Sequence, residues 1–360
     1  MTINDLLAAM GKHGASDMHL RVGEPPVFRV SGDLVRLKSP PLTGEQVQEL
    51  LGGLLDERLQ GEMKARGYAD FSHAIDGVGR FRCNVFKSLG KLSAAIRRVK
   101  PKVPTYDELS LPLQLRKCAA YEQGLVLIGG ITGSGKSTTL AAILDDINHS
   151  RRCHILTIED PVEYVFVDDK AVINQREVFT DVATFDDALR SAVREDPDVM
   201  LLGEMRDADT IETALTAAET GHLVFGTIHS SGAPQTLGRI LDMFPQAKHA
   251  QIRTSLAFNL RCIMNQKLLP GVQKGTMFPC VEMMFTSPLI KKLIQDGEIA
   301  KVAEALAKDR ENGCETYAQA LNRLHKAGSI SMDTALAAAP NPEELRMMMR
   351  GITISDGGIV

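Results

Sequence analysis

Two kinds of hydrophobic pattern divide the chain. Up to about residue 100 the apolar runs are short, and residues 27–30 and 79–86 predict strands. In the second of these, Phe81, Cys83 and Val85 alternate with polar residues. Residues 44–59 predict one helix between these strands. The N-terminal part therefore reads as a small α+β domain.

From residue 124 the pattern changes to longer, mostly apolar runs. Helical segments separate these runs, and residues 140–147 place apolar side chains on one helix face. Alternation of this kind is typical of an α/β domain with a buried parallel sheet. The predicted strands are residues 125–128, 155–158, 199–202 and 223–228.

Prolines mark the boundary between the two parts. Pro101, Pro104 and Pro112 break any helix and predict a linker over residues 101–112. The domains are then expected at residues 1–100 and 113–285. After residue 285 the strand pattern stops, and residues 286–360 are expected to form a helical tail.

Composition narrows the class of protein. The 360 residues, with a mass of 39.2 kDa, suit two or three domains. The formal net charge of -4, the absence of Trp and the low share of aromatic residues, 5%, argue against a nucleic-acid partner. A nucleic-acid translocase built on the same kind of α/β core remains an alternative. A nucleotide-binding scaffold without turnover is the other alternative, and phosphate release distinguishes it.

The six cysteines contain no C-x-x-C pair, so we expect reduced thiols and no zinc site. No apolar run approaches the roughly 18 residues of a membrane span. The first residues lack the cationic region of a secretory signal. A cytoplasmic location is expected.

A phosphate-binding motif provides the strongest functional signal. Residues 130–137 (GITGSGKS) match G-x-x-x-x-G-K-[ST] and lie between a predicted strand and a predicted helix. Lys136 is expected to reach the β- and γ-phosphates of ATP, and Ser137 to ligate Mg²⁺. The expected nucleotide-binding residues are Gly130, Ile131, Thr132, Gly133, Ser134, Gly135, Lys136, Ser137 and Thr138.

Acidic residues follow two of the predicted strands. Glu204 ends the run that begins at residue 199, where a P-loop fold holds Mg²⁺ or its water. Residues 157–163 (TIEDPVE) present three carboxylates, and Pro161 turns the chain at the strand end where α/β sheets bind ligands. One carboxylate, Glu163 or Glu204, is expected to activate the attacking water.

Two histidines flank the next predicted strand. His229 follows its C-terminal end, where the γ-phosphate would lie, so it is a candidate phosphate sensor. His222 precedes the same strand, and an architectural role is expected for it.

In combination, these elements resemble the bacterial secretion and type IV pilus motor ATPases. The resemblance covers nearly the whole chain and is weakest after about residue 300. The family's boxes match residues 158–163 (IEDPVE), 194–199 (REDPDV), 203–207 (GEMRD), 218–225 (AETGHLVF), 16–20 (SDMHL) and 79–86 (GRFRCNVF).

Within the family, the chain resembles the pilus retraction branch, which drives twitching motility. The related assembly and secretion ATPases, which remain the alternative, carry a tetracysteine zinc element and an additional N-terminal domain. The chain departs from the family pattern at two places. Ile131 stands where Pro or Ala is usual, and residues 289–296 (LIKKLIQD) keep the apolar positions of a retraction motif but differ at most of its polar positions.

The resemblance implies a hexameric ring of subunits, each with a PAS-like N-terminal domain and a RecA-like ATPase core. It implies that Arg80, Arg82 and Arg97 reach the nucleotide when domains close, and that Glu204 joins Ser137 at the metal. It also implies a location at the inner-membrane pilus base, with a membrane platform protein and a paralogous pilus ATPase as partners.

Overall fold

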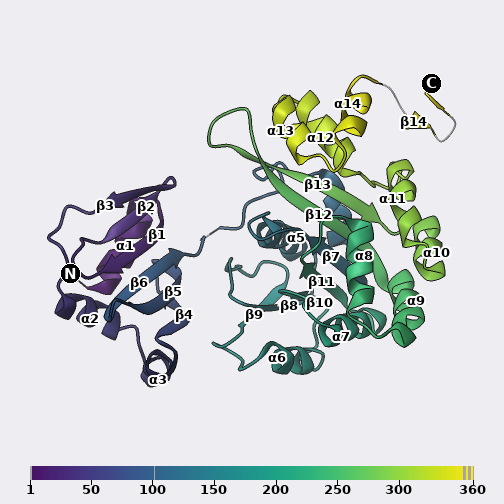
Figure 1. Ribbon diagram of the computed structural model, residues 1–360. Coiled ribbons are helices and arrows are strands. Elements are labelled where there is room, and N and C mark those ends of the chain that lie inside the picture. Colours follow the sequence, from purple (N-terminus) through teal and green to yellow (C-terminus); the bar gives the residue numbers. More distant parts are fainter. Residues whose placement is uncertain (1, 101, 352–353, 356–357, 360) are drawn as a thin grey trace. The chain divides into compact units, whose positions relative to one another are not determined.

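The computed structural model describes residues 2–100, 102–351, 354–355 and 358–359. The chain forms two compact units (Figure 1). Unit 1 contains the residues up to Lys102 together with Pro161–Val165 and Glu177–Ala183. Unit 2 contains Val103–Asp160, Phe166–Arg176 and the residues from Thr184 onward. Two short segments that are flanked in sequence by residues of unit 2 thus belong to the N-terminal unit.

Unit 1 is built on a six-stranded antiparallel sheet in the order β3-β2-β1-β6-β5-β4. Helices α1, α2 and α3 contribute to the same hydrophobic core as the sheet. The elements are α1 (Ile3–Lys12), β1 (Ala15–Arg21), β2 (Val27–Val30), β3 (Asp33–Arg36), α2 (Gly44–Gly52), α3 (Glu57–Arg66), β4 (Tyr68–Ile75), β5 (Gly79–Ser88) and β6 (Lys91–Arg98).

Strand β5 shows why this sheet has one apolar and one polar face. Phe81, Cys83 and Val85 are fully buried in the core. Because side chains alternate along a strand, Arg80 and Arg82 lie on the opposite face. The predicted strands in residues 27–30 and 79–86 are present.

The prediction of one helix over residues 44–59 was wrong. Helix α2 ends at the pair Gly52 and Gly53, and a new helix begins after Asp56, whose carboxylate accepts a hydrogen bond from the Leu59 backbone N–H at 2.8 Å. Glycines weaken a helix and Asp is a preferred N-cap, so the two signals divide the segment. Helix α1, which the sequence analysis did not predict, begins with a capping box at Thr2.

Unit 2 is built on a seven-stranded sheet in the order β13-β12-β7-β11-β10-β8-β9. The pairs β12–β7, β7–β11, β11–β10 and β10–β8 are parallel, and β13 is antiparallel to β12. The strands are β7 (Gly124–Gly129), β8 (His154–Glu159), β9 (Val172–Glu177), β10 (Val199–Leu202), β11 (Leu223–Ile228), β12 (Leu260–Pro270) and β13 (Met277–Phe285). The four predicted parallel strands are all present, whereas β9, β12 and β13 were not predicted.

Helices connect most of these strands, but the described residues between β8 and β9 and between β12 and β13 contain none (Figure 1). Helix α5 (Lys136–Ser150) buries the predicted apolar positions Leu140, Ile143, Leu144 and Ile147. The other helices before the tail are α4 (Arg116–Ala120), α6 (Phe185–Ala192), α7 (Ala208–Glu219), α8 (Ala233–Asp242) and α9 (His249–Asn259), with short 3₁₀ turns at Leu113–Leu115 and Gln246–Lys248.

The tail is helical up to Met349. It contains α10 (Pro288–Asp296), α11 (Ile299–Lys308), α12 (Tyr317–Lys326), α13 (Met332–Ala338) and α14 (Pro342–Met349). Beyond these helices, β14 (Ile354–Ser355) pairs with β15 (Gly358–Ile359), which the sequence analysis did not predict. The predicted α/β class, with an N-terminal domain ahead of a P-loop domain, is confirmed.

Among the residues that the structure describes, none of the helices combines the length and hydrophobicity needed to cross a membrane.

Candidate active site

The phosphate loop connects β7 to α5. Its glycines Gly130, Gly133 and Gly135 have φ of 150°, 79° and 89°, values that side-chain-bearing residues rarely adopt. A Cβ atom on Gly130 would also lie 2.5 Å from the Ser134 hydroxyl oxygen. The motif therefore needs glycine for both conformation and space.

The loop has the chemistry of an anion site. Helix α5 begins at Lys136, so its N-terminal backbone N–H groups and partial positive charge lie next to the loop. The Lys136 ammonium donates hydrogen bonds to the backbone oxygens of Gly130 and Ile131, at 2.8 and 3.0 Å. The buried hydroxyl of Ser134 has no hydrogen-bond partner among the described residues. These groups fit the phosphates of a nucleotide.

Gln266 of β12 forms hydrogen bonds to the phosphate loop and to the first turn of helix α5. Its amide nitrogen donates to the Ser134 backbone oxygen at 2.7 Å, and its amide oxygen accepts from the Thr139 hydroxyl at 2.8 Å. Gln266 is 2% exposed, so both bonds are buried. The sequence analysis missed this residue, because the strand that carries it was not recognised.

Glu204 and His229 form the second part of the site. They follow the neighbouring strands β10 and β11, and the Nε2 atom of His229 lies 3.2 Å from Oε1 of Glu204. The Arg206 guanidinium donates to Oε2 at 2.6 Å. This hydrogen bond, with the positive charges of Arg206 and Lys136, outweighs partial burial and lowers the pKa of Glu204. The carboxylate is therefore kept ionised.

A hollow of about 350 Å³ adjoins both parts of the site. Gly130 and Ile131 of the phosphate loop line it together with His229, and Arg239 of α8 contributes as well. His222 lies at the other end of β11, where its Nδ1 atom is 2.9 Å from the Ala217 backbone oxygen. Unit 2 thus brings His229 and Glu204 beside the phosphate loop and leaves His222 at the far end of the strand.

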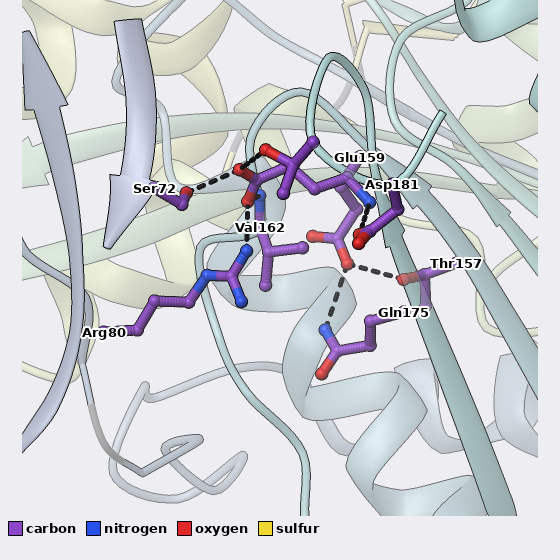
Figure 2. Close-up of polar contacts among 9 residues, drawn as sticks. Ser72, Arg80, Thr157, Glu159, Val162, Gln175 and Asp181 are labelled. Atoms are coloured by element: carbon purple, nitrogen blue, oxygen red, sulfur yellow. Dashed lines mark hydrogen bonds and ion pairs between the residues drawn. The ribbon is translucent and has the colours of Figure 1, made fainter. Parts of the chain in front are cut away.

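The acidic turn after β8 is divided between the two units. Glu159 belongs to unit 2 and accepts hydrogen bonds from the Thr157 hydroxyl at 2.7 Å and the Gln175 amide at 3.2 Å (Figure 2). Glu163 belongs to unit 1, and its side chain is exposed. Of the two candidate bases, only Glu204 shares a unit with the phosphate loop.

The three predicted arginines also belong to unit 1. Arg80 donates to the Glu177 carboxylate at 2.9 Å, and Arg97 donates to Asp17 at 2.7 Å. Arg82 is exposed and is the cross-strand neighbour of Arg97 in the pairing of β5 with β6. The sequence analysis did not identify the acidic partners Glu177 and Asp17.

The donor set of unit 2 fits a magnesium nucleotide. Ser137 and Glu204 offer hydroxyl and carboxylate oxygens, which Mg²⁺ prefers. Among the described residues, the structure contains no cluster of three or more His, Cys, Asp or Glu side chains that could hold a metal ion by themselves.

The chain is similar to known proteins over nearly its whole length. The family model described as "Type II/IV secretion system protein" matches residues 2–326. The type IV pilus retraction ATPase PilT of Pseudomonas aeruginosa is 42% identical over 343 residues, covering 95% of this chain and 99% of that protein. The type IV pilus ATPase PilU of the same organism is 35% identical over 350 residues, covering 97% and 92%.

A solved structure gives the same result. The crystal structure of the pilus retraction motor PilT with bound ADP superimposes with a TM-score of 0.90 at 42% sequence identity. The match covers 97% of this chain and 100% of that one. Similarity of fold and sequence therefore extends over both units.

Proposed function

Because the chain belongs to the type II/IV secretion system protein family, we propose that it is an ATP-driven motor that retracts type IV pili. The observation that carries this proposal is the phosphate loop beside the Glu204–His229 pair, in a chain that matches a retraction ATPase over almost its full length. The enzyme hydrolyses ATP to ADP and phosphate.

The residues of unit 2 account for nucleotide binding. The phosphate loop binds the β- and γ-phosphates through backbone N–H groups, and Lys136 neutralises their charge. Ser137 and Glu204 would hold Mg²⁺, directly or through its water; the ion, when bound, neutralises charge that develops on the phosphates.

Hydrolysis needs a water aligned with the γ-phosphorus. The water oxygen forms a bond to this phosphorus as the bond to the β–γ bridging oxygen breaks, and the water proton passes to a carboxylate or to the phosphate. Glu204 and Glu163 are the candidates for this carboxylate. His229 holds Glu204 through the 3.2 Å contact and, at the end of β11, is positioned to sense the γ-phosphate.

The arginines of unit 1 connect hydrolysis to assembly. We assign Arg82 and Arg97, which are exposed, to the nucleotide of a closed ring. An arginine that arrives only on closure stabilises charge on the transferring phosphoryl group, so hydrolysis depends on movement of domains. A ring of six subunits repeats one head-to-tail interface until it closes, and a neighbour can complete each site.

The same proposal specifies location and partners. The hexamer acts in the cytoplasm, at the base of the pilus on the inner membrane, where a platform protein receives the force and a paralogous pilus ATPase assists. The functional divisions are an N-terminal domain over residues 1–100, a linker over residues 101–112, an ATPase core over residues 113–285 and a helical region over residues 286–360.

The direction of force is tested in the host. Cells lacking the gene are complemented with wild type, with Lys136→Ala or with the control Lys274→Ala, which changes an exposed lysine of the loop between β12 and β13. If the protein drives retraction, cells lacking the gene should carry excess pili that do not retract. Wild type and the control should restore normal piliation, and Lys136→Ala should not. Cells without pili would instead show that the protein drives assembly.

A further inference from the structure

A buried carboxylate lies outside the phosphate site. Glu177, at the end of β9, is 3% exposed and accepts hydrogen bonds at both of its oxygens. One oxygen accepts from the hydroxyls of Ser72 at 2.5 Å and Thr180 at 2.9 Å. The other accepts from the Arg80 guanidinium at 2.9 Å and the Val162 backbone N–H at 3.1 Å.

These donors come from three different segments. Ser72 and Arg80 belong to the hairpin formed by β4 and β5, Val162 to the turn after β8, and Thr180 to the loop after β9. Burial raises the pKa of Glu177, but the hydrogen bonds from Ser72 and Val162 and the charge of Arg80 outweigh it, so the pKa is lowered. The carboxylate is ionised and fully paired, and removing a donor would leave a buried charge uncompensated.

The turn that this cluster holds carries Glu163. Val162 is buried and bonded to Glu177, and Tyr164 is buried and forms a parallel bridge with Lys100. Glu163 lies between these two fixed neighbours with its own side chain exposed. The backbone is therefore anchored on both sides of Glu163.

We propose that Glu177 and Arg80 are positioning residues for Glu163, and that Arg80 acts on hydrolysis through Glu177 and not by touching the nucleotide. This inference rests on the proposed role of Glu163 in hydrolysis. Arg80 has a buried ionic partner within unit 1, whereas Arg82 faces solvent. Because Ser72 and Arg80 come from the β4–β5 hairpin, a displacement of that hairpin would shift the turn that carries Glu163.

A double-mutant cycle tests the proposal on the full-length protein. Glu177→Gln keeps the shape of the side chain and removes its charge, and Arg80→Met removes the guanidinium. Each variant is expected to lower kcat for ATP hydrolysis about tenfold while KM changes less than about twofold, since Glu163 is misplaced and the phosphate loop is intact. The double variant should lose no more than the worse single variant.

The opposite pattern identifies a different role. If Arg80 contacts the nucleotide directly, the losses of the two single variants multiply in the double variant, and KM rises with Arg80→Met; either result overturns the proposal. Asp70→Asn is the matched control, because the Asp70 carboxylate lies in the same hairpin and accepts its hydrogen bond from the Asn84 amide, not from a residue of the turn. Its turnover should equal that of wild type.

Two further variants keep the test informative. If Glu177→Gln does not fold, Ser72→Ala and Thr180→Val each remove one neutral donor and should lower kcat two- to fivefold; unchanged kcat in both refutes the positioning role. Glu163→Gln is measured alongside. Normal turnover in Glu163→Gln overturns the role of Glu163 itself, whereas an inactive Glu163→Gln with a fully active Glu177→Gln overturns only the positioning by Glu177.

Discussion

The imidazole Nε2 of His229 lies 3.2 Å from the carboxylate of Glu204, although the two residues follow different strands. Strands β10 and β11 pair in parallel, with Leu202 opposite Gly226, so their C-terminal ends meet at the same edge of the sheet. The phosphate loop leaves the sheet at that edge as well, because β7 pairs in parallel with β11. Three separate segments of sequence thus form one site through sheet topology alone.

Lys136→Ala is expected to abolish ATP hydrolysis. The methyl side chain leaves the β- and γ-phosphate charges uncompensated, so turnover should fall by at least about 10²-fold at saturating ATP. Phosphate release by purified protein measures this. Lys274→Ala, which changes an exposed lysine, is the control, and equal turnover in the two variants would contradict the assignment of the phosphate loop.

Glu204→Gln and Glu163→Gln are expected to lower kcat by about 10²-fold each while nucleotide still binds. Glutamine keeps the size of the side chain but cannot accept a proton from water. Phosphate release gives kcat, and a fluorescent ADP analogue gives the affinity. A normal kcat for Glu163→Gln with an inactive Glu204→Gln would make Glu204 the only base.

Gln266→Leu is expected to weaken both folding and nucleotide binding. It leaves the Ser134 backbone oxygen and the Thr139 hydroxyl without their buried partner, which should lower the free energy of unfolding by about 1–3 kcal/mol. The loosened loop should raise KM for ATP. Thermal unfolding and steady-state kinetics test this, with the exposed Gln273→Leu as control. If KM is unchanged, Gln266 is not needed to shape the loop.

The stabilisation by Glu177 should depend on pH. Its folded-state pKa is lowered, so the ionised carboxylate stabilises the fold above its unfolded pKa of about 4.3, and this stabilisation is lost as pH falls through the folded pKa. Urea unfolding should show a difference between wild type and Glu177→Gln that is constant at neutral pH and shrinks below about pH 4. A difference that grows on acidification would contradict this.

Mixed rings should recover activity if neighbours share a site. Inactive Lys136→Ala subunits are combined with Arg82→Ala subunits, because one mixed interface then pairs an intact phosphate loop with an intact arginine. We expect turnover above that of either variant alone, and turnover per wild-type chain that rises with protein concentration. No recovery, together with turnover that does not depend on concentration, would indicate a monomeric ATPase.

Much of unit 2 could be predicted because its signals are local. The four buried parallel strands are short apolar runs, and the phosphate loop is a contiguous motif between a strand and a helix. Strand β12 escaped prediction because Asn265 and Gln266 are polar yet buried. Their hydrogen bonds go to Ser230 and to Ser134, residues that lie far away in sequence.

The cluster around Glu177 could not be predicted for the same reason. Arg80 and Glu177 are 97 positions apart in the sequence, and no sequence motif contains both of them. The sequence analysis assigned Arg80 to the nucleotide because of its resemblance to family arginines. Only the folded chain reveals that its guanidinium has a buried carboxylate beside it.

The central position of β7 also affects how the protein is made. Its two hydrogen-bonded neighbours, β11 and β12, begin at Leu223 and Leu260, about 100 or more positions later in the chain. A ribosome that has just translated the phosphate loop has produced neither of them, nor the Gln266 that braces it. The nascent chain can therefore complete the sheet around the phosphate loop only after Gln266 has been translated.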